Sequence, residues 1–358
     1  MQEKIVLSWI KSPIAGRRRK AIKQLTKNAL RDPSKVNDAI EAIKALVNDE
    51  DWSVRCVALG ALTDITLSHP DFIRETTNIL LDKFDDESVN VRLRVLHALT
   101  KLVRINEDII DEDLMNLIEK GLNDENSGVR EATLRFLVEV IEKNPEVLRT
   151  HLEMLNETVN DANPLVRKYS IEALISHLDV LNDEEISSLK ELLFSKLTDP
   201  SIAVRCASLK GLEKLLLDNK LPIDNEFINS LRKKLRDQSI PVKLTALSLV
   251  RDLVAMNPRL ADHFFDIIAS EYLLKEKNLN FKLEVLEFLK EFVKKIPVEI
   301  INRHNIPRAL DILEKATVPK SPKRQRIKDL TRYILEDLLG YTYEVRKKKW
   351  GEVLHREK

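Results

Sequence analysis

Small and apolar residues recur with a helical period after each of nine regularly spaced basic residues. Three residues after eight of them the side chain is small or β-branched, and four and seven residues after nearly all of them it is aliphatic. Offsets of three, four and seven fall on one face of an α-helix. The pattern therefore predicts a helix, here called helix B, starting at each of these basic residues. We call them anchors: Arg18, Arg55, Arg92, Arg130, Arg167, Arg205, Lys243, Lys282 and Arg326.

The anchors define an internal repeat. Successive anchors lie 37 to 39 residues apart, except for a last interval of 44. The letters before them also recur, as DEDWSVR ending at Arg55, DENSGVR ending at Arg130 and DANPLVR ending at Arg167. Six copies match closely, and a fixed period of this length is typical of a repeat architecture.

A second helix, called helix A, is predicted before each helix B. Val36, Ile40, Ile43 and Val47 show the helical period ahead of the second anchor. Prolines 33, 70, 145 and 258 are expected in first turns, where a missing N–H costs no hydrogen bond. Residues 182–185, with the letters NDEE, read as a cap followed by first-turn acids. Two helices per repeat, joined by short turns, make a helical hairpin.

These features resemble the HEAT repeat family. The matching features are an Asp-x4-Val-Arg element, proline near the turn between the two helices, and the apolar stripe, over residues of about 12–338. The resemblance implies an all-α fold, an α-solenoid of about nine HEAT-like hairpins with a period of 37–38 residues. We expect one solenoid over 1–340, with atypical capping repeats at 1–32 and 298–340, and a basic polar tail over 341–358.

The resemblance also assigns the repeated acidic and basic residues to structure. In HEAT proteins, such side chains form a ladder between adjacent turns, and the aspartate can in addition cap the helix that it precedes. We therefore give a structural role to Asp49, Asp124, Asp161, Asp199, Arg55, Arg92, Arg130, Arg167 and Arg205.

Composition narrows the class of protein further. The chain is 43% hydrophobic and 33% charged, with 7 glycines and 5% aromatic residues. Few glycines argue against a sandwich, a barrel or a phosphate-binding loop. The apolar runs are too short for a membrane span, and no signal-peptide core is present. The only cysteines, Cys56 and Cys206, are expected to be buried thiols, which indicates a reducing cytoplasm.

No motif for catalysis or cofactor binding occurs. The seven histidines include no pair at helical spacing and no His-Glu dipeptide, which HEAT-like deoxyhypusine hydroxylases use to bind iron. Phosphate loops and Gly-x-Ser-x-Gly elbows are missing. We expect no catalytic residue, metal, cofactor or small-molecule substrate, and an enzyme on this scaffold is only a third hypothesis.

The exposed side of the B helices is the first candidate surface. Residues five and nine positions after each anchor point away from the apolar stripe and, in a HEAT-like stack, line the concave face. Their charges are mixed, whereas a duplex-binding groove needs cations in most rows. Mixed charge suits an irregular protein partner, although a merely solvated face is the alternative. The candidate residues are Arg94, His97, Lys101, Arg135, Glu139, Glu172, Lys210 and Lys214.

The two ends of the chain are the second candidate surface. The formal net charge is +1, but residues 1–31 carry nine Lys/Arg and one Glu, and residues 301–358 carry fifteen Lys/Arg and eight acidic residues. Such basic clusters can hold nucleic acid or serve solubility alone. The candidates are Arg17, Arg18, Arg19, Lys20, Lys323, Arg324, Arg346, Lys347, Lys348, Lys349 and Trp350.

We therefore expect a non-enzymatic scaffold or adaptor that presents a curved helical surface to a protein partner. The HEAT resemblance implies this, since such arrays act as adaptors in transport coats, phosphatase assemblies, nuclear import and chromosome-organising complexes. The alternative is a nucleic-acid-associated HEAT protein, of the chromosome maintenance or repair type, that binds DNA or RNA through its basic ends.

Overall fold

The computed structural model describes the backbone of residues 8–356 and the side chains of residues 8–340. Within these residues every regular element is a helix, and no strand occurs. The chain divides into two compact units, Met1–Leu189 and Lys190–Lys358. Both are stacks of helical hairpins, so the predicted all-α solenoid is confirmed, and each unit is described by itself below.

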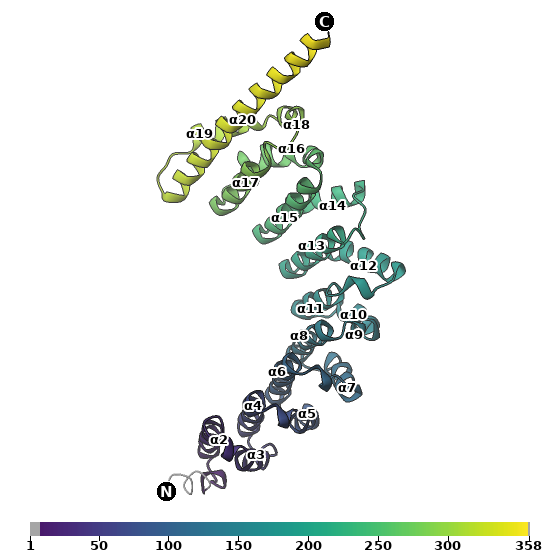
Figure 1. Ribbon diagram of the computed structural model, residues 1–358, viewed down its shortest axis with the longest axis vertical. Coiled ribbons are helices and arrows are strands. Elements are labelled where there is room, and N and C mark those ends of the chain that lie inside the picture. Colours follow the sequence, from purple (N-terminus) through teal and green to yellow (C-terminus); the bar gives the residue numbers. More distant parts are fainter. Residues whose placement is uncertain (1–7, 357–358) are drawn as a thin grey trace. The chain divides into compact units, whose positions relative to one another are not determined.

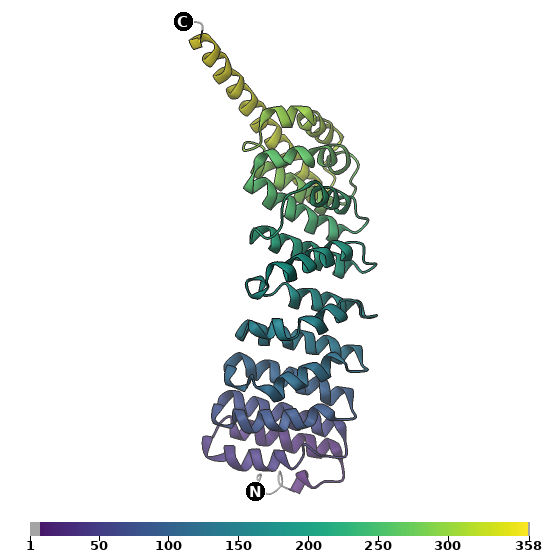
Figure 2. The same ribbon diagram turned by 90° about the vertical axis from the view of Figure 1, so that its right-hand side faces the viewer.

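The first unit has its B helices in one layer, side by side in chain order (Figures 1 and 2). Each begins three residues before its anchor, slightly earlier than the sequence pattern predicted. The residue just before this start caps the helix in α4, α8 and α11, where the side chains of Asp51, Asn126 and Asn163 accept a backbone N–H. The helices are α2 (Ala15–Ala29), α4 (Trp52–Ser68), α6 (Val89–Ile105), α8 (Ser127–Lys143) and α11 (Pro164–Leu174).

The A helices form the second layer of the first unit, and most of them are broken into short pieces. Pro33 and Pro70 each open a 3-10 turn, not an α-helix, and Pro145 is the N-cap of α9. The A segments therefore start at the predicted prolines, but at Pro33 and Pro70 they start as 3-10 turns and not as α-helices. Tight 3-10 turns are common at helix ends. The pieces are η1 (Pro33–Lys35), α3 (Val36–Lys44), η2 (Pro70–Phe72), α5 (Ile73–Asp82), η3 (Lys83–Asp85), η4 (Glu107–Ile109), α7 (Glu112–Leu122), α9 (Glu146–Thr150), α10 (Leu152–Thr158) and η5 (Leu178–Val180).

The second unit continues the same hairpin pattern. Helix α12 (Asp183–Lys196) includes the division between the units, and it opens with the predicted cap, in which Asn182 and Glu185 of the first unit exchange side-chain to backbone hydrogen bonds of 2.8 and 2.9 Å. The B helices of the second unit are α13 (Ile202–Leu217), α15 (Ile240–Met256), α17 (Leu279–Phe292) and α20 (Pro322–Arg356). The A segments are α14 (Asn225–Leu235), η6 (Pro258–His263), α16 (Phe265–Ile267), η7 (Ile268–Leu273), α18 (Val298–Arg303) and α19 (Ile306–Ala316).

The apolar stripe of the B helices forms the core between the two layers. In α4, Ala58, Leu59 and Leu62 are almost completely buried, as the offsets of three, four and seven predict. The last repeat departs from this register, because α20 begins four residues before its anchor and the stripe moves by one position. Tyr333, expected in the core, is 50% exposed, and its neighbour Ile334 is buried instead.

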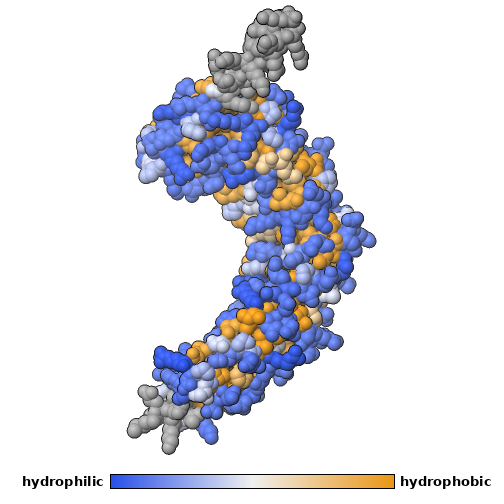
Figure 3. Space-filling model, viewed as in Figure 1, coloured by the Kyte–Doolittle hydropathy of each residue, from blue (hydrophilic) through white to orange (hydrophobic). Residues whose placement is uncertain are grey.

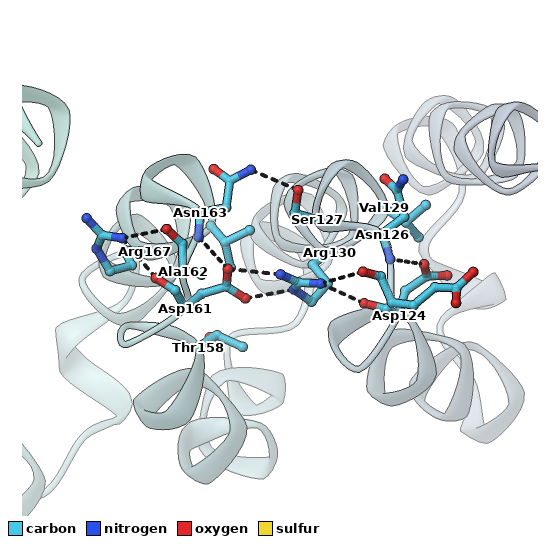
Figure 4. A network of polar contacts seen from close by, with 12 residues as sticks. Asp124, Asn126, Ser127, Val129, Arg130, Thr158, Asp161, Ala162, Asn163 and Arg167 are labelled. Carbon is cyan, nitrogen blue, oxygen red and sulfur yellow. Dashed lines mark hydrogen bonds and ion pairs between the residues drawn. The ribbon is translucent and has the colours of Figure 1, made fainter.

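The repeated Asp and Arg residues form the predicted ladder (Figure 4). Arg130 reaches forward to both carboxylate oxygens of Asp161, at 2.7 and 2.9 Å, and back to the carbonyl oxygen of Asp124 at 2.8 Å. The pairs within the units are Arg18–Asp49, Arg55–Asp86, Arg92–Asp124, Arg130–Asp161, Arg205–Asp237 and Lys243–Glu276. Within each unit, these pairs join neighbouring hairpins along one edge of the stack.

The aspartate does not cap the helix that it precedes, so that part of the interpretation is wrong. Asp161 accepts the N–H of Asn163 at 2.7 Å, and the Asn163 side chain is the cap, accepting the N–H of Leu165 at 2.8 Å. Burial opposes ionisation of Asp161, but the hydrogen bonds from Arg130 and from the Asn163 N–H outweigh it. They hold the pKa of the Asp161 carboxyl below its usual value.

Candidate partner-binding face

The B helices of the first unit expose one face opposite their apolar stripe. Residues two, five, nine and twelve positions after each anchor share this face, because these offsets also follow the helical period. We call it the B face. Its members include Lys23, Lys27, Gly60, Asp64, Arg94, His97, Lys101, Arg104, Arg135, Glu139, Tyr169 and Glu172.

Side-chain contacts join neighbouring helices across the B face. Lys101 of α6 lies 3.4 Å from the Asp64 carboxylate of α4. Arg104 of α6 donates to Glu139 of α8 at 2.9 Å between Nε and Oε2. The Arg135 guanidinium of α8 stands 5.5 Å from the ring centre of Tyr169 on α11. Four helices thus share one continuous polar surface.

Three of the predicted residues surround His97 with positive charge. Partial burial lowers the pKa of His97 first, and Arg94, Arg135 and Lys101 lower it further. The imidazole is therefore neutral at pH 7, and the cluster keeps an excess of positive charge. Arg94 is exposed and has no ion pair among the described residues, so its charge is available to a partner.

A groove between α2 and α4 continues this surface toward the N-terminal end of the stack. Its volume is about 480 Å³, and Gly60 leaves it open, because the nearest side-chain atom to a Cβ there would be Arg94 Nη1 at 3.7 Å. The lining residues are Ile22, Lys23, Thr26, Lys27, Leu30, Arg31, Cys56, Val57, Gly60, Ala61, Asp64 and Arg94. The sequence offsets place Gly60 on the concave face, five positions after Arg55, but they did not indicate the groove or the contribution of Arg31 to it.

Apolar side chains also reach the surface, in separate patches among hydrophilic residues (Figure 3). Leu30 and Trp52 in the first unit are 46% and 47% exposed, and Ile202 in the second is 46% exposed. A surface of this kind offers apolar anchors set among charges, which is the usual composition of a protein interface.

In the second unit, the predicted Lys210 and Lys214 lie beside a pair of carboxyl groups that the sequence did not reveal. Glu213 of α13 hydrogen-bonds with Asp252 and Ser248 of α15. Burial, and then the Asp252 carboxyl, raise the pKa of Glu213 to about 7. Lys210 lowers this pKa slightly and is exposed, whereas Lys214 is half-buried. Glu213 and Asp252 lie eight and nine positions after their anchors. These offsets are the only feature of the sequence that could have indicated the pair.

The basic cluster at the start of α2 is smaller than predicted. Arg17, Arg19 and Lys20 are exposed, but Arg18 is only 6% exposed. The Arg18 guanidinium binds Asp49 at 2.7 Å and the carbonyl oxygen of Ser12 at 2.8 Å, so it belongs to the ladder. This corrects its placement in an anion-binding patch.

The C-terminal candidates lie on α20. Lys323 and Arg324 are exposed in its first turn, and Arg324 lines a groove of about 410 Å³ that includes Ile312 and Val318. Residues 346–350, with the letters RKKKW, belong to the stretch whose side chains lie outside the described residues. Their proposed role as an anion-binding patch stays a prediction.

Within the described residues, no three His, Cys, Asp or Glu side chains are placed to share a metal ion. Cys56 and Cys206 are both free thiols, and Cys206 is partly exposed, contrary to the prediction that both are buried. None of the described helices combines the length and the hydropathy that crossing a bilayer requires.

Comparisons with known proteins agree with the geometry. Residues 53–188 match the family model of the non-SMC mitotic condensation complex subunit 1, and residues 181–210 match that of the HEAT repeat associated with sister chromatid cohesion. No curated protein matches the sequence.

Among solved structures, a chain from the work on Kap95p binding to RanGDP is similar with a TM-score of 0.65 and 11% identity, covering 99% of this chain and 49% of that one. A chain of the Kap95:Nup1 complex has a TM-score of 0.64 and 12% identity, covering 98% of this chain and 48% of that one. The present chain spans about half the length of these relatives, and at such low identity the likeness shows the fold alone.

Proposed function

The chain belongs to the HEAT-repeat α-solenoids, and from this premise we propose that it acts as a non-enzymatic scaffold whose B face receives a protein partner. The observation that carries the proposal is the cross-helix cluster of Arg94, His97, Lys101 and Arg135. Its side chains come from two different hairpins, and the fold brings them together on an exposed surface.

The size and stiffness of the B face support this role. The B helices of the first unit pack at about 10 Å per hairpin, so five of them span about 40 Å. A face of this length can supply the ~800 Å² per partner of a standard protein interface. The buried ladder and core hold the face in one shape, which limits the ordering cost of binding.

The distribution of charge favours protein over a long nucleic acid on this face. Asp64, Glu139 and Glu172 place acids on three of the five B helices, α4, α8 and α11. Phosphates would be repelled at each of these positions, whereas a protein can place a cation or an amide there.

Affinity purification from the native host, washed at low and at high salt, tests the proposal. We expect a stoichiometric protein partner that is lost from the Arg94→Ala/Arg135→Ala variant. An Arg74→Ala variant is the control, because Arg74 is exposed on helix A α5 and has no ion pair among the described residues. A correctly folded protein that captures no partner would contradict the proposal.

The runner-up function is nucleic-acid binding through the basic ends. Two observations favour it: Arg17 and Lys20 are exposed without an ion pair among the described residues, and the matched family models belong to chromosome condensation and cohesion proteins. This function predicts salt-sensitive binding of a DNA duplex that weakens in the Arg17→Gln/Arg19→Gln/Lys20→Gln variant. DNA binding that is unchanged by these substitutions would contradict this function.

We also propose a cytoplasmic location. The two cysteines, Cys56 and Cys206, are free thiols, which suits a reducing compartment. Fractionation of native cells, followed with an antibody against the chain, tests the location.

A further inference from the structure

We propose that the groove between α2 and α4 binds an acidic segment of a partner protein, with carboxylates on its walls and one apolar side chain on its floor. The proposal rests on the scaffold function and names the surface and the chemistry of the partner. It uses the N-terminal part of the B face, where Arg94 is the one lining residue of the groove among the predicted site residues.

One wall of the groove is a row of cations. Lys23 and Lys27 lie one helical turn apart on the same side of α2, and Arg31 lines the groove just beyond the C-terminal end of this helix. Arg94 reaches over from α6, two hairpins away, and its side chain lies 3.7 to 3.9 Å from the position of a Cβ on Gly60. Cations therefore stand on both sides of the opening.

These four cations are unpaired within the part of the chain that the structure describes. The acid in the lining, Asp64, is 3.4 Å from Lys101, which lies outside the groove. The positive field extends beyond the groove to the His97 cluster, where Arg94, Lys101 and Arg135 converge. A carboxylate entering the groove gains from all of these charges.

The floor of the groove is apolar. Ile22 and Ala61 are buried, Val57 is half-buried, and Leu30 at the rim is 46% exposed. Gly60 contributes no side chain, and this absence creates the space. At about 480 Å³ the groove lies in the size range of ligand-binding clefts, enough for a leucine-sized side chain and the backbone that carries it.

An acidic peptide fits this arrangement better than a nucleic acid. No aromatic side chain lines the groove, so a base has nothing to stack on. Arginine and lysine on either side of an apolar floor match carboxylates on either side of an apolar residue.

The test is fluorescence anisotropy of the full-length chain with a labelled synthetic peptide of about twelve residues, enough for about 40 Å when extended. The probe repeats Glu-Glu-Leu. The comparison probes are the same peptide with Gln for Glu, the same peptide with Ser for Leu, and a single-stranded oligothymidine. We expect the Glu-Glu-Leu probe to bind about tenfold more tightly than each comparison probe.

Two variants locate the binding. Lys27→Glu/Arg94→Glu reverses the charge on both sides, and Gly60→Leu fills the groove from a position whose nearest neighbours are only the Arg94 side chain. Both should weaken the probe about tenfold with unchanged circular dichroism. The matched control is Arg74→Glu/Lys233→Glu, which reverses two exposed charges on the A helices α5 and α14 and should leave binding unchanged.

Several results would overturn the proposal. One is equal binding of the Gln peptide, another is tighter binding of the oligothymidine, and a third is unchanged binding by both groove variants. Sedimentation that shows a dimer lost only in the Lys27→Glu/Arg94→Glu variant would assign the groove to a second copy instead. If the groove variants still capture the native partner, the groove is not the binding site of that partner, whereas the scaffold function still holds. Capture of no partner by the unaltered chain would instead remove the scaffold function.

Discussion

Gly121 of α7 packs directly against Thr133 of α8. A Cβ on Gly121 would stand 2.9 Å from Thr133 Cγ2 and closer still to its hydroxyl, and 3.1 Å from Phe84 Cζ. Thr133 is completely buried and donates its hydroxyl to the carbonyl oxygen of Val129 at 2.9 Å. The missing side chain therefore lets helix A and helix B of this hairpin approach each other.

The first prediction concerns this contact. Gly121→Ala should lower the free energy of unfolding of the first unit by about 2 kcal/mol, since overpacking costs more than the helix gains from alanine. Urea titration followed by circular dichroism measures the change.

Two further variants check the cause. Gly60→Ala is the control, because its Cβ would be in ordinary contact at 3.7 Å, and it should be neutral or slightly stabilising. Gly121→Ala/Thr133→Ala removes the clashing atoms and should recover part of the loss. If the double variant is as unstable as the sum of the two single variants, the clash is not the cause.

The fold could be predicted from the sequence because the same pattern of apolar offsets recurs in repeat after repeat. The offsets of three and four from the anchors identified Ala58 and Leu59 as core, and both are fully buried. The pairing of Asp124 with Arg92 could be expected only from the HEAT resemblance. The register shift in α20 was not visible, because a helix start four residues before the anchor depends on the local turn.

The candidate site was predictable only in part. The helical period placed Arg94, Lys101 and Arg135 on one face, since the period is a property of a single helix. The groove at Gly60 and the Glu213–Asp252 pair depend on the distance between neighbouring hairpins. No single-helix pattern contains that distance, so three-dimensional packing had to supply it.

The second prediction concerns the ladder. Arg130→Met should lower the free energy of unfolding by about 3 kcal/mol, because it leaves the Asp161 carboxylate nearly buried and unpaired and removes a donor from the Asp124 carbonyl. The control is Arg135→Met on the same helix, whose charge lies 3.9 Å from Glu131 and is well exposed. Its cost should stay below about 1 kcal/mol. Equal costs for the two variants would show that the ladder adds no stability.

The third prediction uses the raised pKa of Glu213. Its pKa in the folded chain is about 7, against an ordinary value of 4.5, so the folded state binds an extra proton between these values. The free energy of unfolding should therefore fall as the pH rises from 4.5 to 7. Glu213→Gln should raise stability at pH 8 by about 1 kcal/mol, reduced for solvent access, and have little effect at pH 4.5.

The measurement for this prediction is the urea midpoint of the Glu213→Gln variant between pH 4.5 and pH 8. Glu226→Gln is the matched control, since Glu226 is an exposed acid on α14 of the same unit. Glu213 should show a pH-dependent difference and Glu226 none. A constant difference across the range would mean that Glu213 does not titrate there.

The fourth prediction concerns the stability of the chain at acid pH. The pKa of Asp161 lies below its ordinary value of 3.8, because the hydrogen bonds from Arg130 and the Asn163 N–H outweigh burial. A depressed carboxyl pKa contributes stability above the ordinary value and loses it as the pH falls below. The unaltered chain should therefore lose stability as the pH falls below about 4, whereas Asp161→Asn should start less stable at pH 6 and lose less. Asp71→Asn, an exposed acid in the same unit, should parallel the unaltered chain, and an acid transition that Asp161→Asn leaves unchanged would assign it to other carboxyl groups.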